Sequence, residues 1–219
     1  MPHIGHTRLM VNASTTDTET TEEARRNRWC ETFGSNENSI MVYNDLCTRM
    51  SGEGRHYHTM DHIDELLALA EAAKITDKWF HAAIWFHDAV YHPGAKNNEE
   101  FSARLAGKAM PVLGMEGDEQ AKTMAAIRAT KTHKTQDKDI QRFLDADMAI
   151  LGAERERYKR YAADIRQEFS HIGGWRYSWG RRRFLKSCLK RKAIFLTPWF
   201  NHKFEAKARA NIQAELKGF

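Results

Sequence analysis

The stretch DKWFHAAIWFHDAVY, residues 77–91, is apolar on almost every side and carries a histidine and an aspartate near its end. A helix that is apolar all round is buried at the centre of a helical bundle. The residues His92-Pro93-Gly94 then stop it. Because no segment alternates apolar and polar residues over several positions, the sequence predicts an all-α fold around this helix.

Apolar residues at helical spacing continue on both sides of this stretch. Ile63, Leu66 and Ala70 follow a polar helix start at Thr59, and Asn97 can cap the helix that comes after the stop. We expect further helices over residues 117–131, 137–150, 154–170, 178–193 and 201–216, with joints at Gly152, Gly173-Gly174 and Pro198.

Length and composition favour a single domain. The chain has 219 residues, of which 42% are hydrophobic and 29% charged, as in an ordinary globular protein. Residues 1–22 are polar and rich in threonine, so we expect a flexible tail there. Regular structure is expected to begin near Thr21, with one helical domain over residues 23–219.

Nothing in the sequence indicates a membrane or secreted protein. No apolar run approaches the roughly 18 residues that span a bilayer, and the N-terminus lacks the apolar stretch of a signal peptide. The odd number and wide spacing of Cys30, Cys47 and Cys188 argue against a disulfide framework. We therefore expect a cytoplasmic protein with no membrane partner.

The charge balance favours an anionic partner. The formal net charge is +5 and the pI is about 9.1, which suits an anionic substrate or weak nucleic-acid contact. The densest basic run extends from Arg181 to Lys192 and is interrupted at helical spacing by apolar residues such as Phe184 and Leu185. We interpret it as an amphipathic helix with a solvated basic face; phosphate or nucleic-acid binding is the alternative.

Two histidine-containing groups stand at helix ends. His58 and His62 are four residues apart at the start of a predicted helix, where their rings lie near each other. Burying His87 and Asp88 among apolar residues costs several kcal/mol unless their charge is compensated, and a metal ion is a natural compensator. The alternatives are a surface histidine cluster for the first group and a buried hydrogen bond for the second.

A third group, Asp145 and Asp147, interrupts another apolar helix. The two aspartates point about 200° apart on a helical wheel, so they cannot face one site equally. One can be a ligand and the other a supporting or capping group; alternatively, one is solvated and the other ends the helix. With the histidines they make a mixed nitrogen and oxygen site, which suits manganese, iron, nickel or zinc better than magnesium.

The order His…His-Asp…Asp resembles the signature of the HD-domain superfamily of metal-dependent phosphohydrolases, and the chain looks most like a group of predicted hydrolases within it. This resemblance implies a single-domain HD-type helical bundle with one divalent metal held by His62, His87, Asp88 and Asp147. It covers about Trp29 to Leu216. The motifs that carry it are GRHYHTMDHI, AIWFHDAVYHP, NNEEFSA, ATKTH, FLDADMAILG, YKRYAADIRQEF and ARANIQAEL.

The resemblance also implies catalytic roles. The segment from Tyr57 to His62 is similar to the motif of cyclic-nucleotide phosphodiesterases, in which the earlier histidine donates a proton to the leaving group and the later one binds metal. His58 is then the acid and His62 the ligand. Asp88 is expected to act as a base and bridging ligand for the attacking water, whose pKa a divalent ion lowers towards about 7.

Phosphate contacts are expected from Arg55, Lys131 and His133, and Lys131 is also a candidate catalytic residue, because fixed cations stabilise charge on phosphoryl oxygens. Lys131 and His133 end a predicted helix, so favourable placement of cations at a helix C-terminus is the alternative. Glu99 and Asp145 remain candidates for supporting groups or alternative ligands, and a second metal is an alternative to one. Glu99 also fits as an acid in the first turn of a helix.

The resulting expectation is a phosphohydrolase that attacks a phosphorylated small molecule, for which a nucleotide is the favoured class, with metal-activated water. Two alternatives remain: a non-catalytic nucleotide or nucleic-acid binding protein on the same fold, and a di-iron oxygenase on the same scaffold. The sequence does not indicate the substrate, the metal or the oligomeric state.

Overall fold

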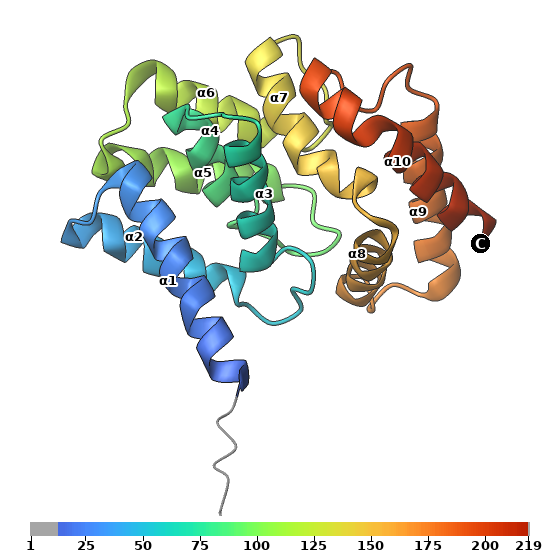
Figure 1. Cartoon of the computed structure of the whole chain (residues 1–219), viewed down its shortest axis with the longest axis horizontal. Helices are drawn as coiled ribbons and strands as arrows, with labels where there is room; N and C mark the ends of the chain where they lie inside the picture. Colours follow the sequence, from blue (N-terminus) through green and yellow to red (C-terminus); the bar gives the residue numbers. More distant parts are fainter. Residues whose placement is uncertain (1–12, 219) are drawn as a thin grey trace, which may run out of the picture.

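The computed structural model describes residues 13–218, and every regular element in this range is helical (Figure 1). This confirms the predicted all-α class. The α-helices are α1 Ala13–Phe33, α2 Glu37–Met50, α3 Met60–Ala72, α4 Lys78–Phe86, α5 Asn98–Ala109, α6 Gly117–Ala129, α7 Lys138–Asp147, α8 Arg155–Glu168, α9 Gly174–Leu189 and α10 Pro198–Lys217, and two short 3-10 helices are η1 Met110–Leu113 and η2 Met148–Gly152.

Helix α4 lies in the core, as its apolar sequence predicts. It contacts α3, α5 and α6, and the residues from Ala82 to Phe86 are buried without a break. The ring of Trp85 meets that of Trp29 from α1 edge-on, with centroids 5.1 Å apart. Burying two such aromatic side chains contributes several kcal/mol through the hydrophobic effect, at about 1.5–3 kcal/mol for each large apolar side chain.

Helix α7 and η2 connect the two ends of the molecule. In Figure 1, α1 to α6 lie on one side of α7, and α8 to α10 lie on the other. A Cβ atom on Gly152, in η2, would lie 2.6 Å from the Cβ atom of Phe204 in α10. No side chain fits in that space, so the joint predicted at Gly152 is a close crossing of two helices.

Several element boundaries differ from the predicted ones. Helix α1 begins at Ala13, earlier than expected, and the rest of the predicted tail, residues 1–12, lies outside the described residues. Helix α9 begins at Gly174, four residues before the predicted start. Helix α4 ends at Phe86, well before His92-Pro93-Gly94. The backbone nitrogen and carbonyl of Val90 are bonded instead to the hydroxyl of Ser102, so a contact with α5 replaces further turns of the helix.

The basic run forms an amphipathic helix as predicted, with one correction. Lys186 of α9 and Lys190, directly after it, are exposed, but Arg181 is buried. Its guanidinium donates to the carboxylate of Glu215 and to the hydroxyl of Tyr161. The first arginine of the run therefore joins α9 to α8 and α10. Among the helices of residues 13–218, none combines the length and apolar character needed to cross a bilayer.

Candidate metal centre

Three side chains from separate parts of the fold converge at one point. His62 comes from the first turn of α3, His87 follows the last residue of α4, and Asp147 ends α7. The His62 Nε2 and His87 Nε2 atoms are 3.2 Å apart, and Asp147 Oδ1 lies 3.4 Å from the first and 3.5 Å from the second. The three residues therefore form a group that could hold a metal ion.

Neighbouring groups orient two of the three ligand atoms. His87 Nδ1 lies 2.9 Å from the Ile84 carbonyl oxygen, which can only accept, so Nδ1 donates and Nε2 is directed toward Asp88 and Asp147. His133 Nε2 donates to Asp147 Oδ2 over 3.0 Å, so Oδ1 remains for an ion. Such outer hydrogen bonds are typical of metal ligands. His62 Nδ1 is buried without a hydrogen-bond partner, so no such bond orients the ring of His62.

Asp88, the fourth predicted ligand, adjoins this group. Its Oδ2 lies 2.8 Å from His87 Nε2 and 4.0 Å from His62 Nε2. Burial favours a raised pKa for Asp88, but His87 and His58 outweigh it and lower the pKa below the ordinary value. Burial acts likewise on Asp147, whose pKa is lowered by hydrogen bonds from His133, His62 and His87. The two carboxylates are therefore ionised, and the same contacts with Asp88 and Asp147 raise the pKa of His87 above its ordinary value, against the effect of burial.

His58 is held on the other side of Asp88. Its Nε2 lies 4.0 Å from Asp88 Oδ2, and its Nδ1 lies 2.7 Å from Glu168 Oε2 at the end of α8. Burial alone lowers the pKa of His58, but the carboxylates of Asp88 and Glu168 raise it above the ordinary value. A histidine that keeps its proton to a higher pH is suited to donate it, as a general acid does.

Glu168 was not predicted as a site residue, and it organises the loop before α3. Its side chain is fully buried, and Oε1 accepts the backbone N–H groups of three consecutive residues, His56, Tyr57 and His58. The hydroxyl of Tyr91 donates to Oε2. Burial favours a raised pKa for Glu168, but the bonds to His58 bring it down to about 2.

A sequence signal for Glu168 exists. Tyr158, Tyr161 and Ile165 of α8 are buried, and Glu168 continues the same stripe at a spacing of three or four residues. A carboxylate on a buried stripe requires several hydrogen-bond donors. The pattern of α8 therefore marks Glu168 as a candidate functional residue.

Arg55, a predicted phosphate contact, bonds to three backbone carbonyl groups near the centre. Its guanidinium donates to the carbonyl oxygens of His58, Asp88 and Ala89. It also lies over the ring of Tyr91, 5.4 Å from the centroid. Arg55 thus connects the loop that carries His58 to the turn that carries Asp88.

Lys131 and Asp145 lie in other surroundings than predicted. Lys131 is exposed, and its ammonium group donates to the carbonyl oxygen of Lys96. No contact joins it to the residues of the centre among those described. Asp145 is buried on the opposite face of α7 from Asp147, as the helical wheel indicates. Its carboxylate accepts from the backbone nitrogens of Leu196 and Thr197 and from the Thr197 hydroxyl. Asp145 therefore anchors the start of α10 and is no alternative ligand.

His133 lies beside Asp147, and Glu99 lies at the start of α5. His133 supports Asp147 directly, which differs from the expected contact with phosphate. Glu99 lies in the first turn of α5, as its helix-acid interpretation predicts. One of its carboxylate oxygens is buried and has no hydrogen-bond partner. It is not part of the convergent group.

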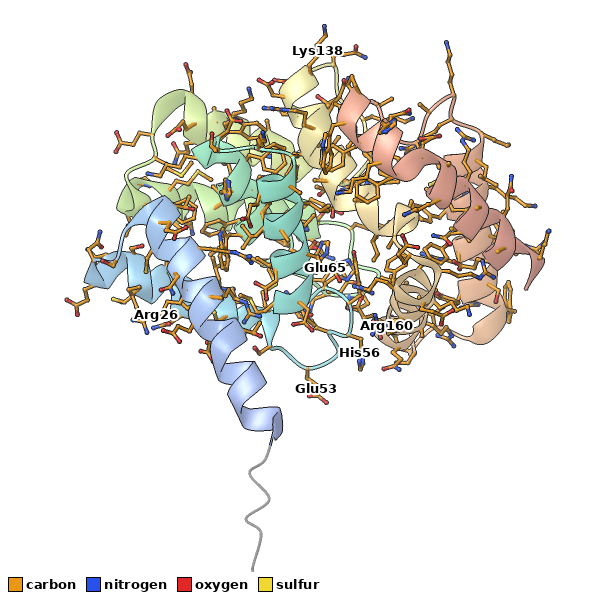
Figure 2. All side chains as sticks on the ribbon, viewed as in Figure 1. Arg26, Glu53, His56, Glu65, Lys138 and Arg160 are labelled. Carbon is orange, nitrogen blue, oxygen red and sulfur yellow. The ribbon has the colours of Figure 1, made fainter. Side chains whose placement is uncertain are left out.

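Two hollows flank this centre, and Tyr57 lines both of them. The first, of about 110 Å³, is lined by His58, His133 and Asp147 together with mainly apolar residues. The second, of about 380 Å³, lies at the seam between α3 and α8, where Figure 2 labels His56, Glu65 and Arg160. Acidic side chains outnumber arginines in the second hollow, so an anion is better accommodated on the side of the first.

Comparisons of the chain with protein-family models, with curated proteins and with solved structures found no match.

Proposed function

We propose that the protein is a metal-dependent phosphohydrolase of the HD type that acts on a phosphorylated small molecule, with a nucleotide as the favoured class. The observation that carries this proposal is the convergence of His62, His87 and Asp147, with Asp88 against them. Two nitrogen and two carboxylate donors fit manganese, iron, nickel or zinc. A divalent ion held there lowers the pKa of water to about 7 and polarises a phosphoryl oxygen.

The chain's own residues supply the remaining chemistry. The Asp88 carboxylate, ionised at neutral pH, accepts a proton from the attacking water. His58, held by Glu168, donates a proton to the leaving oxygen. The distance of 4.0 Å between His58 Nε2 and Asp88 Oδ2 leaves the two groups separate, so an acid and a base face one region. This division of roles favours hydrolysis over binding alone.

A panel of nucleotides and sugar phosphates tests this function. Purified protein with added manganese is expected to release phosphate from at least one class of compound, because the site holds both an acid and a base. Phosphate release and metal content are measured together, and two irons per chain would favour the oxygenase alternative. Release that is unchanged in His87→Ala and Asp88→Ala proteins would contradict the proposal.

A second candidate function is binding of single-stranded nucleic acid along α9. Trp175 and Trp179 are 74% and 63% exposed, and they line a groove of about 780 Å³ with Arg183, Lys186 and Lys190. Exposed indole rings stack on bases, while cations contact phosphates. These side chains occupy one face of a single helix, which suits a short stretch of extended strand.

Fluorescence anisotropy with a labelled single-stranded RNA tests this second candidate. Trp175→Ala and Trp179→Ala are each expected to weaken binding by about 5-fold or more, because base stacking contributes about 1–3 kcal/mol per base. Affinity is expected to fall steeply with salt. Phe101→Ala, which removes an exposed aromatic ring from α5, is the matched control and leaves affinity unchanged. Absence of binding at low salt would exclude this function.

A further inference from the structure

His133 lies between two hollows of the surface. On one side it lines the pocket of about 110 Å³ that contains His58 and Asp147. On the other side it lines a larger groove of about 560 Å³, whose walls come from residues 133–136 and from residues 191–196. His133 is therefore a wall that the pocket at the metal centre and this groove have in common.

The groove is positively charged. Lys134, Arg191 and Lys192 line it, and no acidic side chain does. In the part of the chain that the structure describes, none of these three cations forms an ion pair with a carboxylate, whereas Arg25, Arg157 and Arg181 each do. Three cations without a counter-charge attract an anionic group.

The walls of this groove are fixed from inside the protein. Arg209 donates to the backbone carbonyls of Arg191 and Lys192, and it is itself bonded to Glu205. Asp145 holds Leu196 at the other end of the segment. Helix α7 thus presents Asp147 to the metal centre and Asp145 to the groove wall. A wall held in this way is preorganised, so binding costs little ordering entropy.

The opposite wall begins at His133, which has a φ of 49°. This left-handed backbone conformation is uncommon for a residue with a side chain. The His133 ring donates to Asp147, while Lys134 and Thr135, which follow in the chain, line the groove. The strained residue therefore stands where the metal centre and the basic groove meet.

We propose that the substrate carries at least two phosphate groups: one is hydrolysed at the metal centre, and another is bound by Lys134, Arg191 and Lys192. The substrate class is thus a di- or triphosphate, such as a nucleoside polyphosphate, in preference to a simple monophosphate ester. This inference rests on the proposed hydrolase function and adds the part of the molecule that binds the uncleaved anion.

Calorimetric binding of inorganic triphosphate and of inorganic phosphate, in buffer without free divalent ions, tests the groove. The wild-type protein is expected to bind triphosphate at least about 10-fold more tightly, since several cations act on one polyanion. Replacing two exposed groove lysines, in a Lys134→Ala and Lys192→Ala double variant, is expected to weaken triphosphate binding about 10-fold and to leave phosphate binding unchanged. The matched control replaces two exposed lysines that line neither groove, Lys108→Ala on α5 and Lys217→Ala on α10, and retains the wild-type affinity.

The outcomes separate the two proposals. Equal affinity for the two anions, or equal loss in the groove variant and the control, overturns the inference. If metal binding and hydrolysis of p-nitrophenyl phosphate persist in that case, the hydrolase proposal stands alone. If the protein binds no metal and hydrolyses nothing, but triphosphate binding still depends on Lys134 and Lys192, the groove stands and the hydrolase proposal fails.

Discussion

A His87→Ala protein is expected to lose its divalent ion and to release phosphate at a rate more than about 100-fold below the wild-type rate. The substitution removes a nitrogen that lies within 3.5 Å of both His62 Nε2 and Asp147 Oδ1. Loss of an outer hydrogen-bond partner alone costs metal sites about 10–100-fold, so loss of a direct ligand costs more. Metal content by mass spectrometry and phosphate release by a colorimetric assay measure the two effects.

Two further variants distinguish loss of a metal ligand from misfolding of the protein. Asp147→Asn keeps the shape of the side chain but removes the charge, and the same loss of metal is expected from it. His202→Ala removes an exposed histidine of α10 and is expected to keep full metal content and activity. Wild-type metal content in both His87→Ala and Asp147→Asn would show that these side chains hold no ion.

Glu168→Gln is expected to lower the free energy of unfolding by about 3–5 kcal/mol, the usual cost of breaking a buried charged pair. The glutamine oxygen can still accept the three backbone N–H groups, but its amide then faces His58 Nδ1 and the Tyr91 hydroxyl, both of which donate to the carboxylate. The Tyr91 hydroxyl is left without its acceptor, and His58 must give up its Nδ1 proton to avoid opposing the amide. Denaturant unfolding followed by circular dichroism measures the change.

The difference between wild type and Glu168→Gln is expected to shrink in acid. The pKa of Glu168 in the folded protein is about 2, below the ordinary value of 4.5 for a glutamate. A lowered folded-state pKa means that the stabilisation is present above pH 4.5 and is lost as the pH falls towards 2. Unfolding measured at several pH values between 6 and 2 checks this sign. A constant difference over that range would contradict it.

Glu65→Gln is the matched control. Glu65, labelled in Figure 2, pairs with Arg157 and is 39% exposed at its side chain, so its loss is expected to cost less than about 1 kcal/mol. A positioning role for Glu168 also predicts a change that stability alone does not produce. The nitrogen signals of His58 in an NMR spectrum are expected to show the other neutral tautomer in Glu168→Gln, because Nδ1 has lost its acceptor.

The all-α fold and most helices could be predicted because apolar spacing is a local property. The core position of α4 follows from its composition, and the opposed directions of Asp145 and Asp147 follow from helical geometry. The end of α4 could not be predicted in this way. The hydroxyl of Ser102 and the guanidinium of Arg55 bond the turn after Phe86 from distant parts of the chain.

The same difference between local spacing and long-range contacts applies to the candidate site. The group formed by His62, His87 and Asp147 agrees with three of the predicted ligands. Histidines and aspartates in apolar helices could be recognised as candidate metal ligands from the sequence. Arg55 and Lys131 donate to backbone carbonyl oxygens that spacing did not predict, because a cation's partner depends on which carbonyl or carboxylate folding brings near it. The roles of basic residues therefore depend on tertiary contacts, which cannot be predicted from their spacing in the sequence.

Arg55 has a last consequence for motion. Its guanidinium donates to carbonyl groups in two loops. One is His58, before α3, and the other is Asp88, after α4 and 33 residues away in the sequence. Opening either loop breaks bonds in both, so the two segments form one cooperative unit of local unfolding. Protection of their amides against hydrogen exchange then rises and falls together, and a bound ligand that orders one loop orders the other.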